Sequence, residues 1–255
     1  MALTVKTRKE IALLREGGRR LAQILKTVAV EVRSGVSSKT LNELAEKLMR
    51  AGGDTPSFLG YSPSGAKRPF PAALCVSVND EVVHGIPNEE EKILKEGDTV
   101  TLDAGLIHGG LFTDSAITVG VGNIDEKART LLETTEEALA VGIRAVRAGA
   151  TTGDIGFAIE TFVKPFGYGI VRELAGHGVG YAVHEDPFVP NFGKKGEGVV
   201  LKAGMVIAIE PMLNEGSAGV KLAPDGYTYR TKDGSRSAHF EHTVVVTENG
   251  CDILT

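Results

Sequence analysis

Cysteine is scarce in this sequence, and long apolar runs are missing from it. Only Cys75 and Cys251 occur in the 255 residues, too few for a disulfide framework, which suits a reducing compartment. No stretch approaches the roughly 18–20 consecutive apolar residues that a membrane span needs. Residues 1–10 turn charged early and lead into no apolar signal segment. We therefore expect a cytoplasmic protein that is neither exported nor held in a membrane.

An excess of basic charge is also missing. The net charge is −5 and the isoelectric point lies near 5.7, and the basic residues are scattered, with no cluster beyond the pair Lys194-Lys195. This balance argues against specific binding to nucleic acid. The sequence contains no Gly-x-Ser-x-Gly elbow, no glycine-rich phosphate loop and no His-Glu-x-x-His run. A Ser-His-Asp hydrolase is therefore disfavoured.

The residues that are present have clear periodicity, and 42% of them are hydrophobic, enough for a large core. Helical spacing of apolar residues, with capping pairs such as Thr7 and Glu10, predicts helices over residues 7–35, 40–52, 125–147 and 154–166. Apolar-rich runs predict strands over 73–83, with a turn at Asn79-Asp80, and over 101–115, 206–210 and 240–247. We expect loops over 55–71 and 187–198 and a glycine-rich turn around His177.

The stretch 101–115 is predicted to be a β-hairpin that carries two acidic residues. Its glycines, in His108-Gly109-Gly110, permit the positive φ of a tight turn. A loop at His108-Gly109 places Asp103 directly opposite Asp114, whereas a loop at Gly109-Gly110 places them diagonally on one face. Like charges so close are destabilising. The pair is either exposed to solvent or neutralised, and a bound cation would neutralise it best.

The order of elements repeats within the chain. Residues 32–35 match residues 146–149 at an offset of 114, and residues 94–97 match residues 201–204. We predict an α+β fold in one domain, 1–255, made of pseudo-repeats at about 1–122 and 123–255. The two pseudo-symmetric halves would share an antiparallel-rich sheet flanked by helices, with a site between them.

The second half supplies two further acids at matching positions. Glu210 corresponds to Asp103 by the repeat, and Glu241 corresponds to Asp114. Each glutamate alone is typical of a solvated strand end. Four carboxylates that converge on one cleft cannot all be ionised without a counter-charge. Together they favour a site for two metal ions.

Three of the six histidines have sequence surroundings typical of a site. His177 lies between glycines, which allow close approach of a ligand, and it is the predicted nitrogen ligand. His84 and His184 are predicted to contact substrate and to hand over protons or hydrogen bonds. The other three histidines are interpreted as structural. One nitrogen and several oxygen ligands suit Mn, Fe(II), Co or Zn.

With these residues in view, the sequence resembles type I methionine aminopeptidase, of peptidase family M24 and the pita-bread fold, over essentially its whole length. The motifs that carry the resemblance are Ser-Val-Asn-Asp-Glu-Val-Val-His-Gly-Ile-Pro, Leu-Asp-Ala-Gly with Phe-Thr-Asp-Ser, Gly-His-Gly-Val-Gly, Ile-Glu-Pro-Met and Phe-Glu-His-Thr. The resemblance implies as metal ligands Asp103, Asp114, His177, Glu210 and Glu241. It further implies that Asp114 and Glu241 bridge two metals.

The resemblance also implies the remaining site residues. His84 and His184 match histidines that contact substrate, Tyr61 and Cys75 match residues of the methionine pocket, and Asn79 and Ser237 match a peripheral Na or K site. The family pattern is departed from at Phe58, Val183 and Tyr227, which affects the shape of that pocket and not the chemistry.

The activity implied is removal of N-terminal methionine from nascent polypeptides when the second residue is small. A hydroxide bridging two divalent ions would attack the scissile carbonyl, with Glu210 as proton acceptor. We expect a cytoplasmic monomer that works near the ribosome, without a membrane or nucleic-acid partner. A proline-specific peptidase of the same fold usually carries an additional N-terminal domain, for which 255 residues leave no room. A non-catalytic binding relative would be expected to have lost metal ligands, and all five ligand residues are present here.

Overall fold

Four helices form where the apolar periodicity predicts them. The computed structural model describes residues 3–63 and 65–255 of the chain. The helices it contains are α1 (Arg8–Val30), α2 (Ser38–Ala51), α3 (Glu126–Arg144) and α4 (Thr152–Val163), the last followed by the short 3-10 helix η1 (Lys164–Phe166). Side chains cap each helix start, and Thr7 and Glu10 form the predicted capping box of α1. The first helix ends at Val30, before Gly35, and Ser37 caps the second.

Nine strands form one sheet that holds the molecule together. Its order is β1-β4-β5-β14-β9-β7-β8, with β2 paired to β4 and β15 to β14. The strands are β1 (Thr55–Pro56), β2 (Cys75–Val78), β4 (Thr99–His108), β5 (Leu111–Gly120), β7 (Gly176–Gly178), β8 (Glu185–Val189), β9 (Val206–Ile209), β14 (Glu241–Val246) and β15 (Cys251–Ile253). All of the pairings are antiparallel.

Two small sheets complete the β-structure. One has the order β13-β10-β6 and the other β11-β12-β3. Their strands are β3 (Glu81–Val83), β6 (Gly169–Ile170), β10 (Met212–Asn214), β11 (Val220–Leu222), β12 (Tyr229–Thr231) and β13 (Ser237–His239). Most of these short strands escaped prediction because they lack a long apolar run.

The hairpin of β4 and β5 decides between the two predicted registers. The turn is Gly109-Gly110, with φ of +56° and +81°, and Gly105 pairs with Asp114 while Asp103 pairs with Ala116. Direct opposition of Asp103 and Asp114 is therefore wrong, and the diagonal arrangement is correct. Both side chains remain on one face of the sheet. Asp103 pairs with Ala116, and Asp114 lies two residues from Ala116 on the same strand, so it points to the same side.

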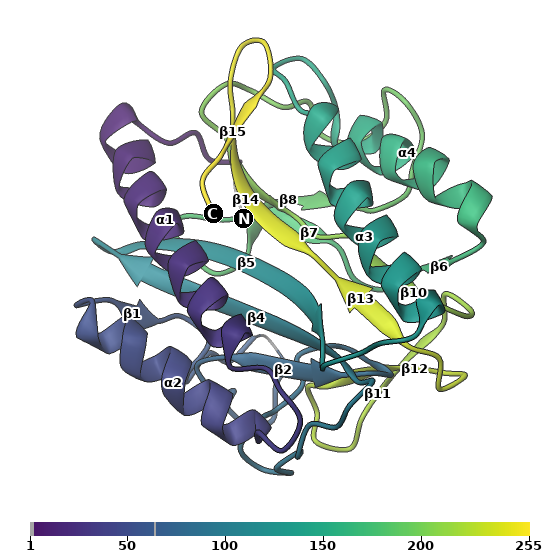
Figure 1. The fold of residues 1–255 in the computed structure, drawn as a ribbon. Coiled ribbons are helices and arrows are strands. Elements are labelled where there is room, and N and C mark those ends of the chain that lie inside the picture. Colours follow the sequence, from purple (N-terminus) through teal and green to yellow (C-terminus); the bar gives the residue numbers. More distant parts are fainter. Residues whose placement is uncertain (1–2, 64) are drawn as a thin grey trace.

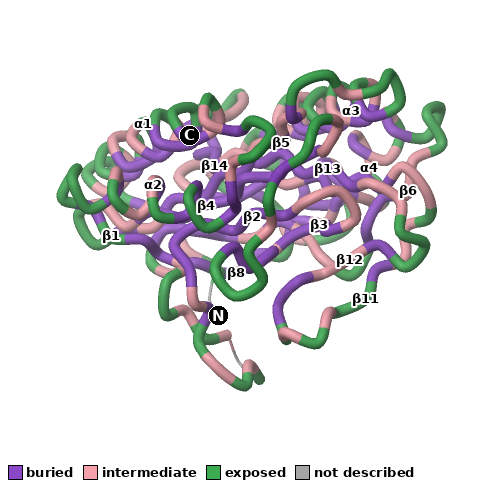
Figure 2. The backbone as a smooth tube through the Cα atoms, turned by 60° about the horizontal axis from the view of Figure 1, so that its bottom comes forward, coloured by how far each residue is buried: buried purple, intermediate pink, exposed green. Residues whose placement is uncertain are grey.

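The helices pack in pairs on the sheet, and each pair covers its own core (Figure 1). Helices α1 and α2 bury apolar side chains against β2 and β4, where Leu21, Leu41 and Leu102 are fully buried. Helices α3 and α4 do the same against β9 and β14, with Leu131 and Ile159 at the centre. The tube coloured by burial shows buried sheet strands beneath helices with exposed outer sides (Figure 2). The predicted class, α+β with helices on an antiparallel-rich sheet, is confirmed.

Local features of the two helix pairs run in parallel. Ser37 and Thr151, which cap α2 and α4, also form isolated β-bridges, to Ile93 and Val200 respectively. A long helix precedes each of these caps: α1 ends at Val30, before Ser37, and α3 ends at Arg144, before Thr151. The division of the chain into two pseudo-repeats near residue 122 stays a prediction, and these parallels are consistent with it.

Three predicted loop segments are wrong in part, and the first of them, 55–71, begins with strand β1. The stretch around His177 is strand β7 rather than a turn, because Gly176 and Gly178 pair with β8 and with β9. The segment predicted as a loop from residue 187 begins within β8. Over residues 3–63 and 65–255, no helix is both long enough and apolar enough to cross a membrane.

Candidate metal centre

One cavity, of about 350 Å³, gathers side chains from both halves of the chain. Every predicted site residue lines it except Asn79 and Ser237. The predicted residues in its wall are Tyr61, Cys75, His84, Asp103, Asp114, His177, His184, Glu210 and Glu241. The fold therefore brings together groups that lie up to 180 residues apart, a separation given by Tyr61 and Glu241.

Adjacent strands of the main sheet position the acidic groups. Asp103 lies on β4 and Asp114 on β5, and Glu241 is the first residue of β14, where it pairs with Ala116. Glu210 directly follows β9, and His177 lies on β7. Because these strands are neighbours in the order β4-β5-β14-β9-β7, side chains at matching heights on one face converge.

The polar atoms in this cluster are close enough to share a cation. One ligand atom from each of Asp114, His177 and Glu241 lies within 4.8 Å of the others. Glu210 adjoins this group, because its Oε1 lies 3.4 Å from Nε2 of His177. These are oxygen and imidazole nitrogen donors, the set that first-row divalent metals accept.

Burial shifts the pKa values of the cluster toward the neutral forms of its side chains. It raises the pKa of Asp103 to about 7, and it raises the pKa of Asp114, Glu210 and Glu241 well above the usual range, where their mutual repulsion adds to it. Burial also lowers the pKa of His177 to about 3, with the charge of His184 adding to the effect, so its imidazole is neutral and free to ligate.

Unsatisfied oxygens mark the same place. Oδ1 of Asp103 and Oε1 of Glu241 are buried without a hydrogen-bond partner. A buried polar atom without a partner is costly, and native proteins rarely leave one unexplained. Coordinated cations would satisfy both atoms and offset the repulsion, so the residues present fit a metal site.

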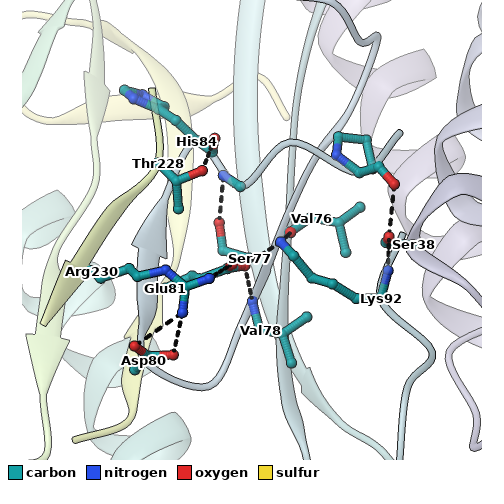
Figure 3. A network of polar contacts seen from close by, with 12 residues as sticks. Ser38, Val76, Ser77, Val78, Asp80, Glu81, His84, Lys92, Thr228 and Arg230 are labelled. Carbon is teal, nitrogen blue, oxygen red and sulfur yellow. Dashed lines mark hydrogen bonds and ion pairs between the residues drawn. The ribbon is translucent and has the colours of Figure 1, made fainter. Parts of the chain in front are cut away.

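His84 reaches the cavity from a strained backbone. Its φ is +58°, a conformation that costs a residue with a Cβ about 1–3 kcal/mol. The hydroxyl of Thr228 is shared between the Asp225 carboxylate, at 2.6 Å, and the His84 carbonyl, at 3.2 Å, and the next amide, of Gly85, donates to Oγ of Ser77 at 3.1 Å (Figure 3). The His84 ring also hydrogen-bonds the backbone of Tyr227, while burial lowers its pKa to about 4.

A buried ionic network supports the turn that precedes His84 (Figure 3). The Glu81 carboxylate is buried and accepts from Lys92, from Arg230 at 2.6 Å and from the Val78 amide at 2.9 Å. Arg230 also binds Asp80 through both carboxylate oxygens. The turn between β2 and β3 is thereby tied to β12.

His184 lies beside the proposed metal cluster. Its ring centroid is 4.4 Å from that of His177, and its Nδ1 is 2.8 Å from the hydroxyl of Tyr61. Burial lowers its pKa. A neutral His184 whose Nδ1 is occupied by Tyr61 directs its other nitrogen elsewhere in the site.

Apolar side chains form the rest of the wall. Phe58, Phe70 and Tyr227 line the cavity together with Cys75, and the rings of Phe70 and Tyr227 meet edge to face with centroids 5.2 Å apart. Burial raises the pKa of the Cys75 thiol well above its usual range, so the thiol is neutral. Val183 is buried but does not line the cavity.

His239 is a site residue that the sequence did not reveal. It is buried, neither of its ring nitrogens has a hydrogen-bond partner, and its Nε2 lies 3.6 Å from Oε2 of Glu210. Burial lowers its pKa to about 3. Its place on β13, two residues before Glu241, was the available signal.

Asn79 and Ser237 lie together, outside the cavity. The Ser237 amide donates to the Asn79 carbonyl at 2.9 Å. Asn79 has φ of +55°, and its amide group donates to Asp98 at 2.8 Å. The two residues predicted for a monovalent cation are thus neighbours.

Comparison with known proteins identifies the class to which this fold and cluster belong. The model of metallopeptidase family M24 matches residues 12–248, and the chain belongs to this family. Methionine aminopeptidase 1 of Bacillus subtilis is 44% identical over 250 residues, which cover 98% of each chain. The crystal structure of methionine aminopeptidase from Thermotoga maritima has a TM-score of 0.95 and 41% identity, covering 100% of this chain and 99% of that one.

More distant members of the same fold have another specificity. Prolidase from Pyrococcus furiosus matches with a TM-score of 0.76 and 26% identity, and the match covers 98% of this chain and 65% of that one. Methionine aminopeptidases of Clostridium perfringens and Aquifex aeolicus are more similar to this chain, at 44% and 46% identity over 99% and 100% of it.

Proposed function

We propose that this chain removes the N-terminal methionine of polypeptides whose second residue is small, with two divalent metal ions in the cavity. The observation that carries the proposal is the convergence of three buried and two largely buried ligand groups with no compensating charge among the described residues around them. The full-length similarity to methionine aminopeptidases supports the substrate. The ligands are Asp103, Asp114, His177, Glu210 and Glu241.

Within this set we assign Asp114 and Glu241 to both metals. Each lies at the centre of the strand order, on β5 and β14, between β4 on one side and β9 on the other. Asp103 then serves one metal, and Glu210 with His177 serves the other. Bound Co, Mn, Fe(II) or Zn would generate a hydroxide nucleophile near neutral pH and polarise the scissile carbonyl.

Glu210 acts as proton acceptor as well as ligand. Burial and the neighbouring aspartates raise its pKa well above the usual carboxyl range in the metal-free cluster, and a bound cation would oppose that shift and keep the carboxylate ionised and able to accept a proton. Its two oxygens face His177 and His239 at 3.4 and 3.6 Å. A carboxylate held between two neutral imidazoles can receive a proton without losing its position.

His184 donates a hydrogen bond to the oxygen that becomes negative as the carbonyl is attacked. We assign the Tyr61 hydroxyl, 2.8 Å from Nδ1 of His184, as the donor in this contact, which leaves Nε2 with its proton. His84 acts near the leaving amide nitrogen, where its neutral ring can give or take a proton. Both histidines contact substrate and are catalytic residues.

The side-chain pocket is formed by Tyr61, Cys75 and the aromatic residues of the cavity wall. Phe58, Phe70 and Tyr227 present ring faces and edges to it. A thioether gains from contact with aromatic rings, and a neutral buried thiol adds no charge to repel it. This composition favours methionine over a charged or short side chain.

We assign a peripheral Na or K ion to the region of Asn79 and Ser237, which the contact between the two residues supports. The substrates are nascent polypeptides in the cytoplasm, near the ribosome, and the protein acts as a monomer. The absence of a basic cluster supports a function without nucleic-acid specificity.

Peptide hydrolysis tests the proposal directly. Protein loaded with Mn or Co is expected to release methionine from Met-Gly-Met-Met, and chelated protein is expected to leave it intact. An Xaa-Pro dipeptide serves as the control for prolidase-like specificity and should remain uncleaved. An intact Met-Gly-Met-Met in the presence of Mn and of Co would contradict the proposal.

A further inference from the structure

The loop that carries His184 is closed by the carboxylate next to it. Glu185 is buried but does not line the cavity that His184 lines. Its Oε1 accepts hydrogen bonds from the amides of Tyr181 and Ala182, the latter at 3.1 Å. The residues between β7 and β8 have no regular secondary structure, so these bonds fix the turn that presents His184.

The other oxygen of Glu185 is bound by the N-terminal segment. Oε2 accepts from Nζ of Lys6 and from Oγ1 of Thr4, both at 2.7 Å. The side chain of Lys6 is 0% exposed and that of Glu185 is 3% exposed. Such a buried ion pair is strongly destabilised when one partner is removed, because the other charge is left unpaired. The pair lies 179 residues apart in sequence.

Three further contacts seat Lys6, two of them with this loop. Its Nζ lies 4.2 Å from the ring centroid of Tyr181, and its amide donates to the carbonyl of Gly204 at 2.8 Å. A Cβ on Gly180 would lie 2.4 Å from Cε of Lys6, so the loop passes the lysine stem with no space for a side chain. The fit of Lys6 therefore includes the backbone, the stem and the charge.

We propose that Lys6 is a positioning residue for peptide hydrolysis, which acts on His184 through the Glu185 carboxylate. Loss of the Lys6 charge frees Glu185 to turn toward water, which loosens the amides of Tyr181 and Ala182. The ring of His184 then loses its fixed place beside His177 and Tyr61. The effect is on the reaction step and not on the metal, because no proposed ligand contacts Lys6 or Glu185 in the hydrogen bonds and ion pairs of the described residues.

This inference rests on the role of His184 under the proposed function, and a double-mutant cycle separates the two. The variants are Lys6→Met, which keeps the stem and removes the charge, His184→Ala and the combination. Each is loaded with Mn, and kcat and KM for Met-Gly-Met-Met are measured well below the melting temperature, together with bound Mn. Arg15→Met is the matched control, because it breaks an exposed ion pair between α1 and Asp252.

Lys6→Met is expected to lower kcat at least tenfold with KM and bound Mn unchanged, and Arg15→Met is expected to change none of them. In the His184→Ala background, Lys6→Met should have no further effect on kcat, because its action passes through His184. Equal kcat losses from Lys6→Met in both backgrounds, or no loss in the wild-type background, would overturn the proposal.

Two other results are distinguishable. If His184→Ala itself keeps full kcat, the role of His184 under the proposed function is wrong and this inference fails with it. If Lys6→Met does not fold, Thr4→Val provides the test, since it removes the hydroxyl that donates to Glu185 and accepts from Lys6 and keeps the ion pair between those two residues. Thr4→Val should lower kcat by a smaller factor in the wild-type background only, and an unchanged kcat would overturn the proposal.

Discussion

His84 and His184 stand at matching places in the two halves, within Val-His-x-x-Pro in each, yet the fold holds them differently. His84 has a strained backbone, with φ of +58°, and is held by hydrogen bonds to its own carbonyl and to the next amide. His184 is held by the carboxylate of the following residue, Glu185, which in turn depends on Lys6.

The difference shows that one type of side chain can be directed by two physical devices. Around His84, Ser77 and Thr228 compensate for strain at the residue itself, so its position depends on short-range geometry. Around His184, a buried ion pair transmits order from the N-terminal segment, so its position depends on a long-range contact. Variants of metal ligands and variants of the residues that hold a histidine in place should therefore differ in their effects on metal content, stability and kcat.

The largest effect is expected from removing the proposed metals. Chelation should abolish hydrolysis and lower the melting temperature, because metal bound only by the native state stabilises it by about 2.7 kcal/mol at 100 times Kd. Calorimetry with and without Mn measures this. If the chelator leaves the melting temperature unchanged, the native state binds no metal at these carboxylates and the proposed site is wrong.

Replacing a catalytic histidine should have the next largest effect. His84→Ala is expected to lower kcat by about 10²–10⁴, the usual contribution of a positioned acid–base group. Steady-state kinetics with Met-Gly-Met-Met measures it. A kcat within twofold of wild type would remove His84 from the reaction.

Asp114→Asn tests the charge argument at the centre of the cluster. The variant should lose the stabilisation that Mn gives, and without metal it should melt at or above the metal-free wild type, because burial and Asp103 make a charged carboxylate costly at this place and Asn carries no charge. Calorimetry of both proteins, each with and without Mn, decides this. A metal-free variant that melts well below metal-free wild type would make Asp114 a structural hydrogen-bonding residue.

The pH dependence of stability gives a smaller signal from His84. Burial lowers its pKa to about 4 from 6.5, so the unfolded state binds the proton first as pH falls. The stability from a neutral His84 is full above about pH 6.5 and is lost toward pH 4. Denaturant unfolding gives the free energy of unfolding of metal-free wild type and of His84→Asn at each pH. As pH falls over that range, wild type should lose more of this free energy than the variant. A constant difference would contradict the buried neutral state.

The smallest effect is expected where the His84 backbone is supported. Thr228→Val removes the hydroxyl that is shared between the Asp225 carboxylate, at 2.6 Å, and the His84 carbonyl, at 3.2 Å, and should cost about 0.5–1.5 kcal/mol of stability, with a several-fold loss of kcat. Thr130→Val is the control, because it removes an exposed helix hydroxyl bonded only to the Glu126 carbonyl. Equal kcat values for the two variants would leave the His84 support without a role.

Periodicity and the repeated order of elements predicted the four helices, the central hairpin, and the carboxylates and histidines that meet in the cavity, whereas Tyr61 and Cys75 came only from the resemblance to the family. The exact hairpin register depended on whether His108 belongs to the turn, which the glycines alone do not decide. The short strands β10 to β13 and the place of His239 escaped prediction because tertiary contacts, rather than local propensity, form them.

The supports of the histidines were also beyond prediction. Lys6 and Glu185 are 179 residues apart, and neither belongs to a periodic pattern or a ligand-like motif. Thr228 reaches His84 across 144 residues. Contacts of this kind follow from the packed fold, so a single sequence gives no sign of them.

Metal content tests the central claim, that the acidic cluster with His177 binds metal while His84 and His184 serve the reaction. Bound Mn is measured by elemental analysis for His177→Ala, His84→Ala and His184→Ala after identical loading. The account predicts that His177→Ala loses metal, whereas the other two retain the wild-type content and have lowered kcat. Equal loss of metal in all three variants would contradict it, because His84 and His184 would then be ligands.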